Sequence, residues 1–206
     1  MSYHIYTTEG IILKRTPFGE ANVVLHILTA DLGLIMASAR SARLSVSKLR
    51  PALQEYTLGS VSAVKSKNGW KITNVVETGN FFFEYPKYCH RTLAQISSVL
   101  LQMITGESPH PEIFQTVKSG FQTLGVWAPL TPSVGGWETG LISNFEALMV
   151  LRILHELGYI SYRGDTSVEE LLKNMNEWNT ALLEKSGQNK KNIISLINKG
   201  LKESHL

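Results

Sequence analysis

The hydrophobic pattern of this 206-residue chain changes its period close to Gly79. Before that residue, short runs of alternating or β-branched residues are separated by turn residues, which is typical of strands. After it, apolar residues recur at intervals of three and four, which is typical of amphipathic helices. The pattern therefore predicts an α+β protein with two domains, residues 1–79 and residues 80–206.

The first domain contains five predicted strands with little room for helices between them. They cover residues 5–15, 22–29, 34–39, 51–64 and 70–77. Asn68-Gly69 lies between the last two and is a strong hairpin signal. Five short strands in about 80 residues favour a five-stranded antiparallel barrel of the oligonucleotide/oligosaccharide-binding (OB) type. An SH3-like barrel is the competing interpretation.

The second domain is predicted to be all-α. The expected helices cover residues 86–105, 113–124, 141–157, 166–185 and 189–202, with loops at 107–112 and 128–139. Residues 141–157 are apolar over much of the helix circumference, so we expect this helix at the centre of a bundle, with Gly158 as its C-cap.

Positive charge is concentrated in the first domain. Residues 1–79 hold nine Lys and Arg against five Asp and Glu, although the whole chain carries only +3. The segment 38–50 carries Arg40, Arg43, Lys48 and Arg50 with serines between them and no acid. Cations and short hydroxyl donors suit phosphate oxygens, so this segment is the main candidate for binding nucleic acid. A solvated basic loop without a ligand is the alternative.

Two further groups of cations lie at predicted turns of the barrel. One is Lys14 and Arg15 with Phe18, and the other is Lys65, Lys67 and Lys71 with Trp70. OB barrels bind oligonucleotides at these connections and on the face of strands two and three, where aromatic rings stack on bases. Alternatively, Phe18 covers the barrel end and Trp70 packs across a strand pair.

The residues give no support for an enzyme, a metal site or a cofactor. The six histidines are scattered without a ligand spacing such as H-E-x-x-H, and no glycine-rich loop follows a strand. Cys89 is the single cysteine, which excludes an internal disulfide and a cysteine-based zinc site. The start lacks a signal-peptide pattern, and no apolar run reaches the length of a membrane span, so we expect a cytoplasmic protein without a membrane partner.

Several stretches, taken in order, resemble the RecO family of bacterial recombinational repair proteins. Residues 10–21 (G-I-I-L-K-R-T-P-F-G-E-A) are similar to its first strand and turn, and residues 28–34 (L-T-A-D-L-G-L) to its next turn. The basic segment 38–54 resembles the family's third connection. Residues 106–114 (G-E-S-P-H-P-E-I-F) and 145–159 (F-E-A-L-M-V-L-R-I-L-H-E-L-G-Y) resemble parts of its helical domain.

The resemblance implies an OB barrel followed by a helical domain, in a nucleoid-associated protein. It implies binding of single- and double-stranded DNA, annealing of complementary strands, and help in loading the RecA recombinase with RecR onto DNA coated by single-strand-binding protein. Many family members carry a four-cysteine zinc module after the Gly-Tyr at the end of the central helix. Here Gly158-Tyr159 is followed by no cysteine, so the resemblance is to the zinc-free members.

The resemblance also implies a groove in the helical domain for the acidic, apolar-tipped tail of single-strand-binding protein. Leu148, Leu151 and Arg152 are the expected contributors, unless Arg152 only pairs with Glu156 four residues on. Two other functions stay open at this point. One is a protein-interaction adaptor with an OB barrel, and the other is an RNA-binding OB protein.

Overall fold

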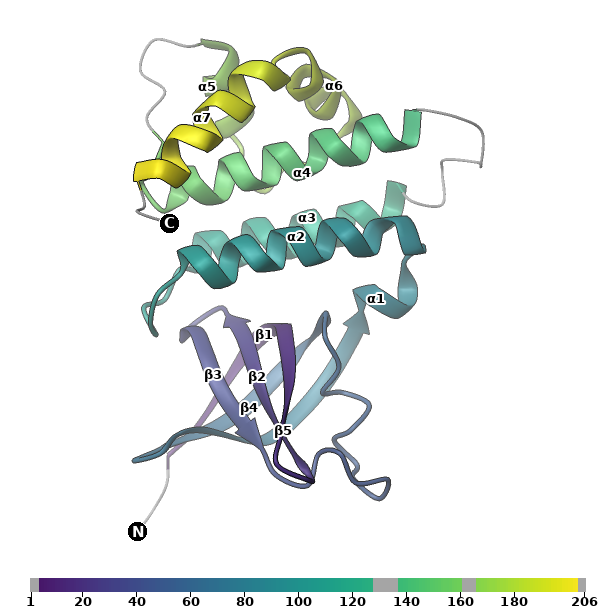
Figure 1. Cartoon of the computed structure of the whole chain (residues 1–206), viewed down its shortest axis with the longest axis vertical. Helices are drawn as coiled ribbons and strands as arrows, with labels where there is room; N and C mark the ends of the chain where they lie inside the picture. The colour runs from purple at the N-terminus through teal and green to yellow at the C-terminus, as the bar shows by residue number, and fades with distance from the viewer. Residues whose placement is uncertain (1–3, 128–136, 161–165, 204–206) are drawn as a thin grey trace. The chain divides into compact units, whose positions relative to one another are not determined.

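The computed structural model describes residues 4–127, 137–160 and 166–203 (Figure 1). It divides into two compact units, which are described separately below. The barrel unit comprises residues 1–84 and 104–114, and the helical unit comprises residues 85–103 and 115–206. The expected boundary between residues 79 and 80 stays a prediction about separately folding domains.

Five strands form the barrel. They are β1 (Ile5–Phe18), β2 (Asn22–Thr29), β3 (Gly33–Ala39), β4 (Thr57–Ser66) and β5 (Gly69–Asn80), and they close in the order β1-β2-β3-β5-β4. The expected α+β class and the five-stranded barrel are confirmed. One detail differs, since β3 and β5 pair in parallel whereas the other four pairs are antiparallel. The parallel pair arises because β3 and β5 are joined through β4 rather than by a hairpin.

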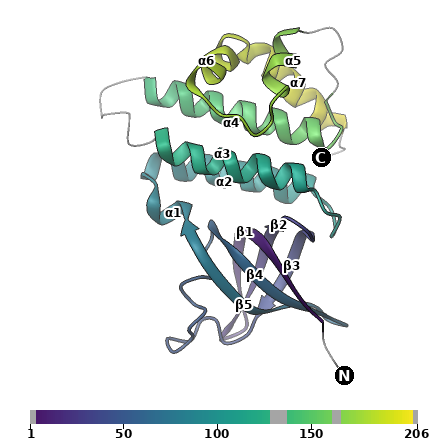
Figure 2. The same cartoon turned by 180° about the vertical axis from the view of Figure 1, so that it is seen from behind.

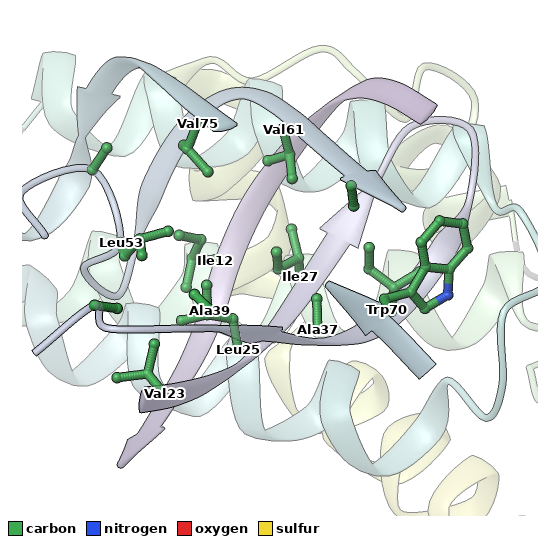
Figure 3. Close-up of a cluster of buried hydrophobic side chains, with 14 residues drawn as sticks. Ile12, Val23, Leu25, Ile27, Ala37, Ala39, Leu53, Val61, Trp70 and Val75 are labelled. Atoms are coloured by element: carbon green, nitrogen blue, oxygen red, sulfur yellow. The ribbon is translucent and has the colours of Figure 1, made fainter. Parts of the chain in front are cut away.

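The barrel core follows from the alternation of side chains along each strand. Val23, Leu25 and Ile27 of β2 point inward, as do Ile35, Ala37 and Ala39 of β3, and all six are buried. Figure 3 shows this cluster with Trp70 at one end and Leu53 at the other. Leu53 comes from the loop 40–56 between β3 and β4, so part of this loop belongs to the core.

The remaining elements are helices. They are α1 (Phe81–Glu84), α2 (Lys87–Met103), α3 (Pro111–Trp127), α4 (Trp137–Glu156), α5 (Thr166–Leu172), α6 (Thr180–Gln188) and α7 (Lys190–Glu203). As expected, α4 is central to the helical unit and packs against α2, α6 and α7. Gly158 follows α4 with a φ of 80°, a left-handed C-cap conformation that glycine adopts readily. No helix in the described ranges is long and apolar enough to cross a membrane.

Two segments of the helical unit were expected to have other bounds. Residues 166–185 were expected as one helix, but they form α5 and α6 with an irregular segment, residues 173–179, between them. The reason lies in the asparagines of this segment, since the Asn179 side chain accepts a 2.8 Å hydrogen bond from the backbone N–H of Leu182 and starts a new helix. Of the expected loop 128–139, residues 128–136 lie outside the described residues, and residues 137–139 belong to α4.

Candidate nucleic-acid interface

The outer surface of β1, β2, β3 and β5 carries aligned polar and apolar side chains. Because the even-numbered positions of β2 and β3 point outward, Val24 lies opposite Ser38 and His26 opposite Met36. On the flanks, Phe18 of β1 pairs with Asn22, and Lys71 of β5 lies in register with Ser38. The four strands thus present one continuous outer surface.

A groove lies on this surface. It has a volume of about 570 Å³ and is lined by Phe18, Asn22, Val24, Met36, Ser38, Arg40, Asn68, Gly69, Trp70 and Lys71. Phe18 and Met36 are both 62% exposed, although each is large and apolar. This lining includes two cations and no carboxylate. It therefore combines positive charge with an exposed aromatic ring, the two features that single-stranded nucleic acid requires.

The first part of the basic segment is fixed beside this groove. The guanidinium Nη1 of Arg43 donates to the Gly19 carbonyl at 3.0 Å, and the Arg43 backbone N–H donates to Ala21 at 2.9 Å. The backbone N–H of Ser41 donates to the side-chain oxygen of Asn22 at 3.0 Å. These bonds join the start of loop 40–56 to the β1–β2 turn, which places Arg40 in the groove lining and Arg43 next to it.

The other predicted cations are distributed differently. Lys48 and Arg50 are exposed further along loop 40–56, and Lys67 is exposed in the β4–β5 hairpin. An irregularity after Ile12 places Lys14 opposite His26 on the outer surface. Burial, and to a lesser degree Lys14, lower the pKa of His26.

Arg15 lines a separate hollow. Its backbone N–H donates to the Glu55 carboxylate at 2.9 Å. The hollow has a volume of about 380 Å³ and is lined by Arg15, Pro17, Gln54, Glu55, Phe82 and Phe83. Unlike the groove, it contains a carboxylate, so its charge is balanced.

Trp70 and Lys65 are engaged within the barrel unit. Trp70 is only 4% exposed, because it points inward opposite the small Ala37, and its ring packs edge-on against Tyr6. The packing interpretation therefore applies, and the ring is not accessible for stacking on a base. Lys65 lies over Trp70 and donates to Glu107 at 2.5 Å, and this hydrogen bond is the main cause that lowers the pKa of Glu107. A lysine with a carboxylate partner is a poorer candidate for binding phosphate.

The barrel is similar in sequence to a known protein domain. Residues 1–82, which contain the whole barrel, match the family model described as "Recombination protein O N terminal". Residues 1–82 are therefore similar to the N-terminal domain of RecO proteins.

Relatives named DNA repair protein RecO agree with this. The one from Dehalococcoides mccartyi strain 195 is 30% identical over 122 residues, 59% of this chain and 48% of the relative. The one from Thermodesulfovibrio yellowstonii is 30% identical over 115 residues, 53% of this chain and 44% of the relative. The one from Heliobacterium modesticaldum is 23% identical over 155 residues, 75% of this chain and 52% of the relative. The chain thus spans about half the length of these RecO relatives.

The residues that the RecO resemblance suggested for partner binding are all internal. Leu148, Leu151 and Arg152 have no exposed surface. Arg152 does not form the wall of an open groove, because its guanidinium binds backbone carbonyls of Leu171, Met175 and Glu177 inside the helical unit. The structure therefore gives these three residues a packing role.

The described residues include neither a group of side chains suited to a metal ion nor an exposed thiol. Within residues 4–127, 137–160 and 166–203, no three His, Cys, Asp or Glu side chains are grouped to hold a metal ion. Cys89 is buried in α2, and burial raises the pKa of its thiol to about 11, so it remains an uncharged packing residue at neutral pH.

The sequence interpretation missed several groove residues. Asn22, Val24 and Met36 were assigned to strands without a functional role. The alternation itself carries the signal, since Met36 lies between the inward-pointing Ile35 and Ala37 and must point outward.

Proposed function

We propose that this chain binds single-stranded DNA in the groove over β1, β2, β3 and β5 and acts in DNA repair and recombination. The observation that carries the proposal is the position of the groove. OB barrels take oligonucleotides on the face of strands two and three, between the first turn and the hairpin of strands four and five. In this chain the groove at that position is lined by the cations Arg40 and Lys71 and by the exposed side chains of Phe18 and Met36.

The finer activities rest on the RecO resemblance. They are binding of double-stranded DNA, annealing of complementary strands, and RecA loading with RecR on DNA coated by single-strand-binding protein. The relatives' printed name, DNA repair protein, supports the repair role. The proposal requires no catalytic centre and no cofactor, because binding and positioning of strands are its only chemical steps, and it places the protein with the nucleoid.

The first prediction concerns the two cations of the groove. Each phosphate neutralised on a single strand contributes about 0.7 to the slope of log affinity against log salt. The double variant Arg40→Ala/Lys71→Ala should therefore lower this slope by about 1.4 and weaken binding to every sequence alike. Titration of a fluorescent oligonucleotide at several salt concentrations measures both quantities.

A matched control removes two exposed cations of the helical unit, Lys87→Ala/Lys202→Ala, and should leave the slope unchanged. If the groove variant keeps the wild-type slope, the groove is not the DNA site. The variant with Arg40, Arg43, Lys48 and Arg50 all replaced then shows whether the basic loop carries the contact, with a loss of about three units expected if all four bind phosphates. Competition with RNA of the same sequence tests the RNA-binding alternative.

The second prediction concerns the exposed ring in the groove. Stacking of one base on an aromatic side chain contributes about 1–3 kcal/mol, so Phe18→Ala should weaken single-strand binding by a factor between about 5 and 150. The salt slope should not change, because no cation is removed. Phe83→Ala is the control, since Phe83 is 71% exposed but lies outside the groove. Equal effects of the two variants would contradict stacking on Phe18.

A further inference from the structure

The loop 40–56 exposes two apolar side chains among its cations. Leu44 is 45% exposed and Val46 is 83% exposed. They lie between Arg43 and Lys48, in a segment that contains no acid from residue 38 to residue 50. Figures 1 and 2 show this loop extending from the barrel beside the β1–β2 turn.

The loop is anchored in the barrel on both sides of these two residues, so their exposure is a property of an ordered segment. Ala42 before them and Leu53 after them are buried in the barrel core. Between these anchors, backbone hydrogen bonds of 3.1–3.2 Å form successive turns. They run from Leu44 to Ser41, from Ser47 to Leu44 and from Arg50 to Ser47. The chain thus buries some apolar residues of the loop and presents Leu44 and Val46 outward.

The loop is also continuous with the DNA groove. Arg40, at its start, lines the groove, and Ser41 is bonded to Asn22, another lining residue. A DNA strand that leaves the groove at this end would therefore pass the exposed side chains of Leu44 and Val46. Lys48 and Arg50, which follow Val46 in the loop, supply charge for further phosphates.

We propose that Leu44 and Val46 form an apolar wedge that contacts the terminal base pair of a duplex, so that the preferred ligand is a junction of single- and double-stranded DNA. This rests on the proposed function of the groove. Apolar side chains on cationic proteins insert between or against bases, because bases are the apolar surface that a nucleic acid offers. Terminal base pairs expose that surface without prior unstacking, and the surrounding cations match the charge of both strands.

The test compares three fluorescent DNA probes with equal numbers of phosphates: a single strand, a blunt duplex and a duplex with a single-stranded tail. The wild-type protein should bind the tailed duplex about tenfold more tightly than the single strand, in line with burial of two partly exposed aliphatic side chains. The double variant Leu44→Ser/Val46→Ser should lose this preference. Its affinity for the single strand and its salt slope should stay within about twofold of wild type, since no cation is removed.

One further measurement and two further variants complete the design. With 2-aminopurine at the terminal base pair, fluorescence should change when wild type binds and should stay unchanged with the double variant. Val76→Ser is the matched control, because Val76 is 59% exposed on β5 and is absent from the groove lining. The single variant Val46→Ser repeats the test at the more exposed position, where a change in folding is not expected.

The outcomes separate the two proposals. Wild-type protein that binds the single strand without preferring the tailed duplex overturns the wedge alone. A preference that survives in Leu44→Ser/Val46→Ser overturns it as well. Wild-type protein that binds none of the three probes overturns the proposed function and the wedge together.

Discussion

Replacing Arg152 by Met should destabilise the helical unit by about 3–5 kcal/mol, because three backbone carbonyl groups would lose the guanidinium that donates to them. Arg152 has no exposed surface and donates from Nε and Nη2 to the Leu171 carbonyl at 3.1 and 2.9 Å. Its Nη1 donates to Met175 and Glu177, both at 2.8 Å. Each acceptor left unpaired costs about 1–3 kcal/mol, less where water reaches it.

The guanidinium is suited to this position in charge and in shape. Burial lowers the pKa of Arg152 to about 10, so it remains a cation at neutral pH. Its plane lies over the Trp178 ring, with the central carbon 4.3 Å from the ring centre. Arg152→Lys should therefore recover little stability, because an ammonium group cannot supply donors in the same planar arrangement.

Urea unfolding followed by circular dichroism measures the loss. Arg91→Met, at an exposed position of α2, is the control and should change stability by less than about 0.5 kcal/mol. If Arg152→Met is as stable as wild type, then water or a rearranged segment 173–179 must supply the hydrogen bonds that these carbonyl groups lose.

Local patterns in the sequence were sufficient to predict the five strands of the barrel, except that residues 51–56, expected as the start of the fourth strand, form turns before β4 begins at Thr57. The alternation of β2 and β3 and the Asn68-Gly69 turn are properties of neighbouring residues, and the structure follows them, with Ser66 paired to Gly69 at the hairpin. The parallel pairing of β3 with β5 is different, because it depends on how loop 40–56 and β4 return the chain. No local pattern contains that information.

The candidate site was predictable in kind but not in composition. Phe18, Arg40 and Lys71 are far apart in the sequence, and only the strand register brings them to one groove. The same register turns Trp70 into the core, although it is a neighbour of Lys71. A cationic segment therefore indicates a polyanion partner, whereas the selection among its residues requires the three-dimensional pairing.

The error at Arg152 has a similar origin. The RecO resemblance implied a groove with apolar walls and a cation, and Arg152 was the cation that helix 141–157 offered. Its actual partners are backbone carbonyls in and around the segment 173–179, which was expected to be helical. Carbonyl groups inside a helix are already bonded, so only the irregular segment makes them available to the guanidinium.

Gly33→Ala should destabilise the barrel unit by about 3 kcal/mol or more. Gly33 has a φ of 73°, which costs a residue with a Cβ about 1–2 kcal/mol. The Cβ would also lie 2.2 Å from the carbonyl oxygen of Ser108, closer than any real contact of this kind. The turn cannot move away easily, because the Thr29 hydroxyl donates to the Gly33 carbonyl at 2.7 Å and accepts from Leu32 at 3.0 Å.

Gly69→Ala separates the two causes of this loss. Gly69 has a φ of 89° but nothing within 4 Å of the added Cβ, so only the conformational cost of about 1–2 kcal/mol applies. Thermal unfolding of both variants against wild type gives the contribution of the contact with Ser108 as the difference. Since residues 104–114 belong to the barrel unit, we expect this difference to be at least as large as the cost at Gly69. Equal losses would show instead that the segment around Ser108 moves aside at no cost, and that its contact with the β2–β3 turn does not stabilise the barrel.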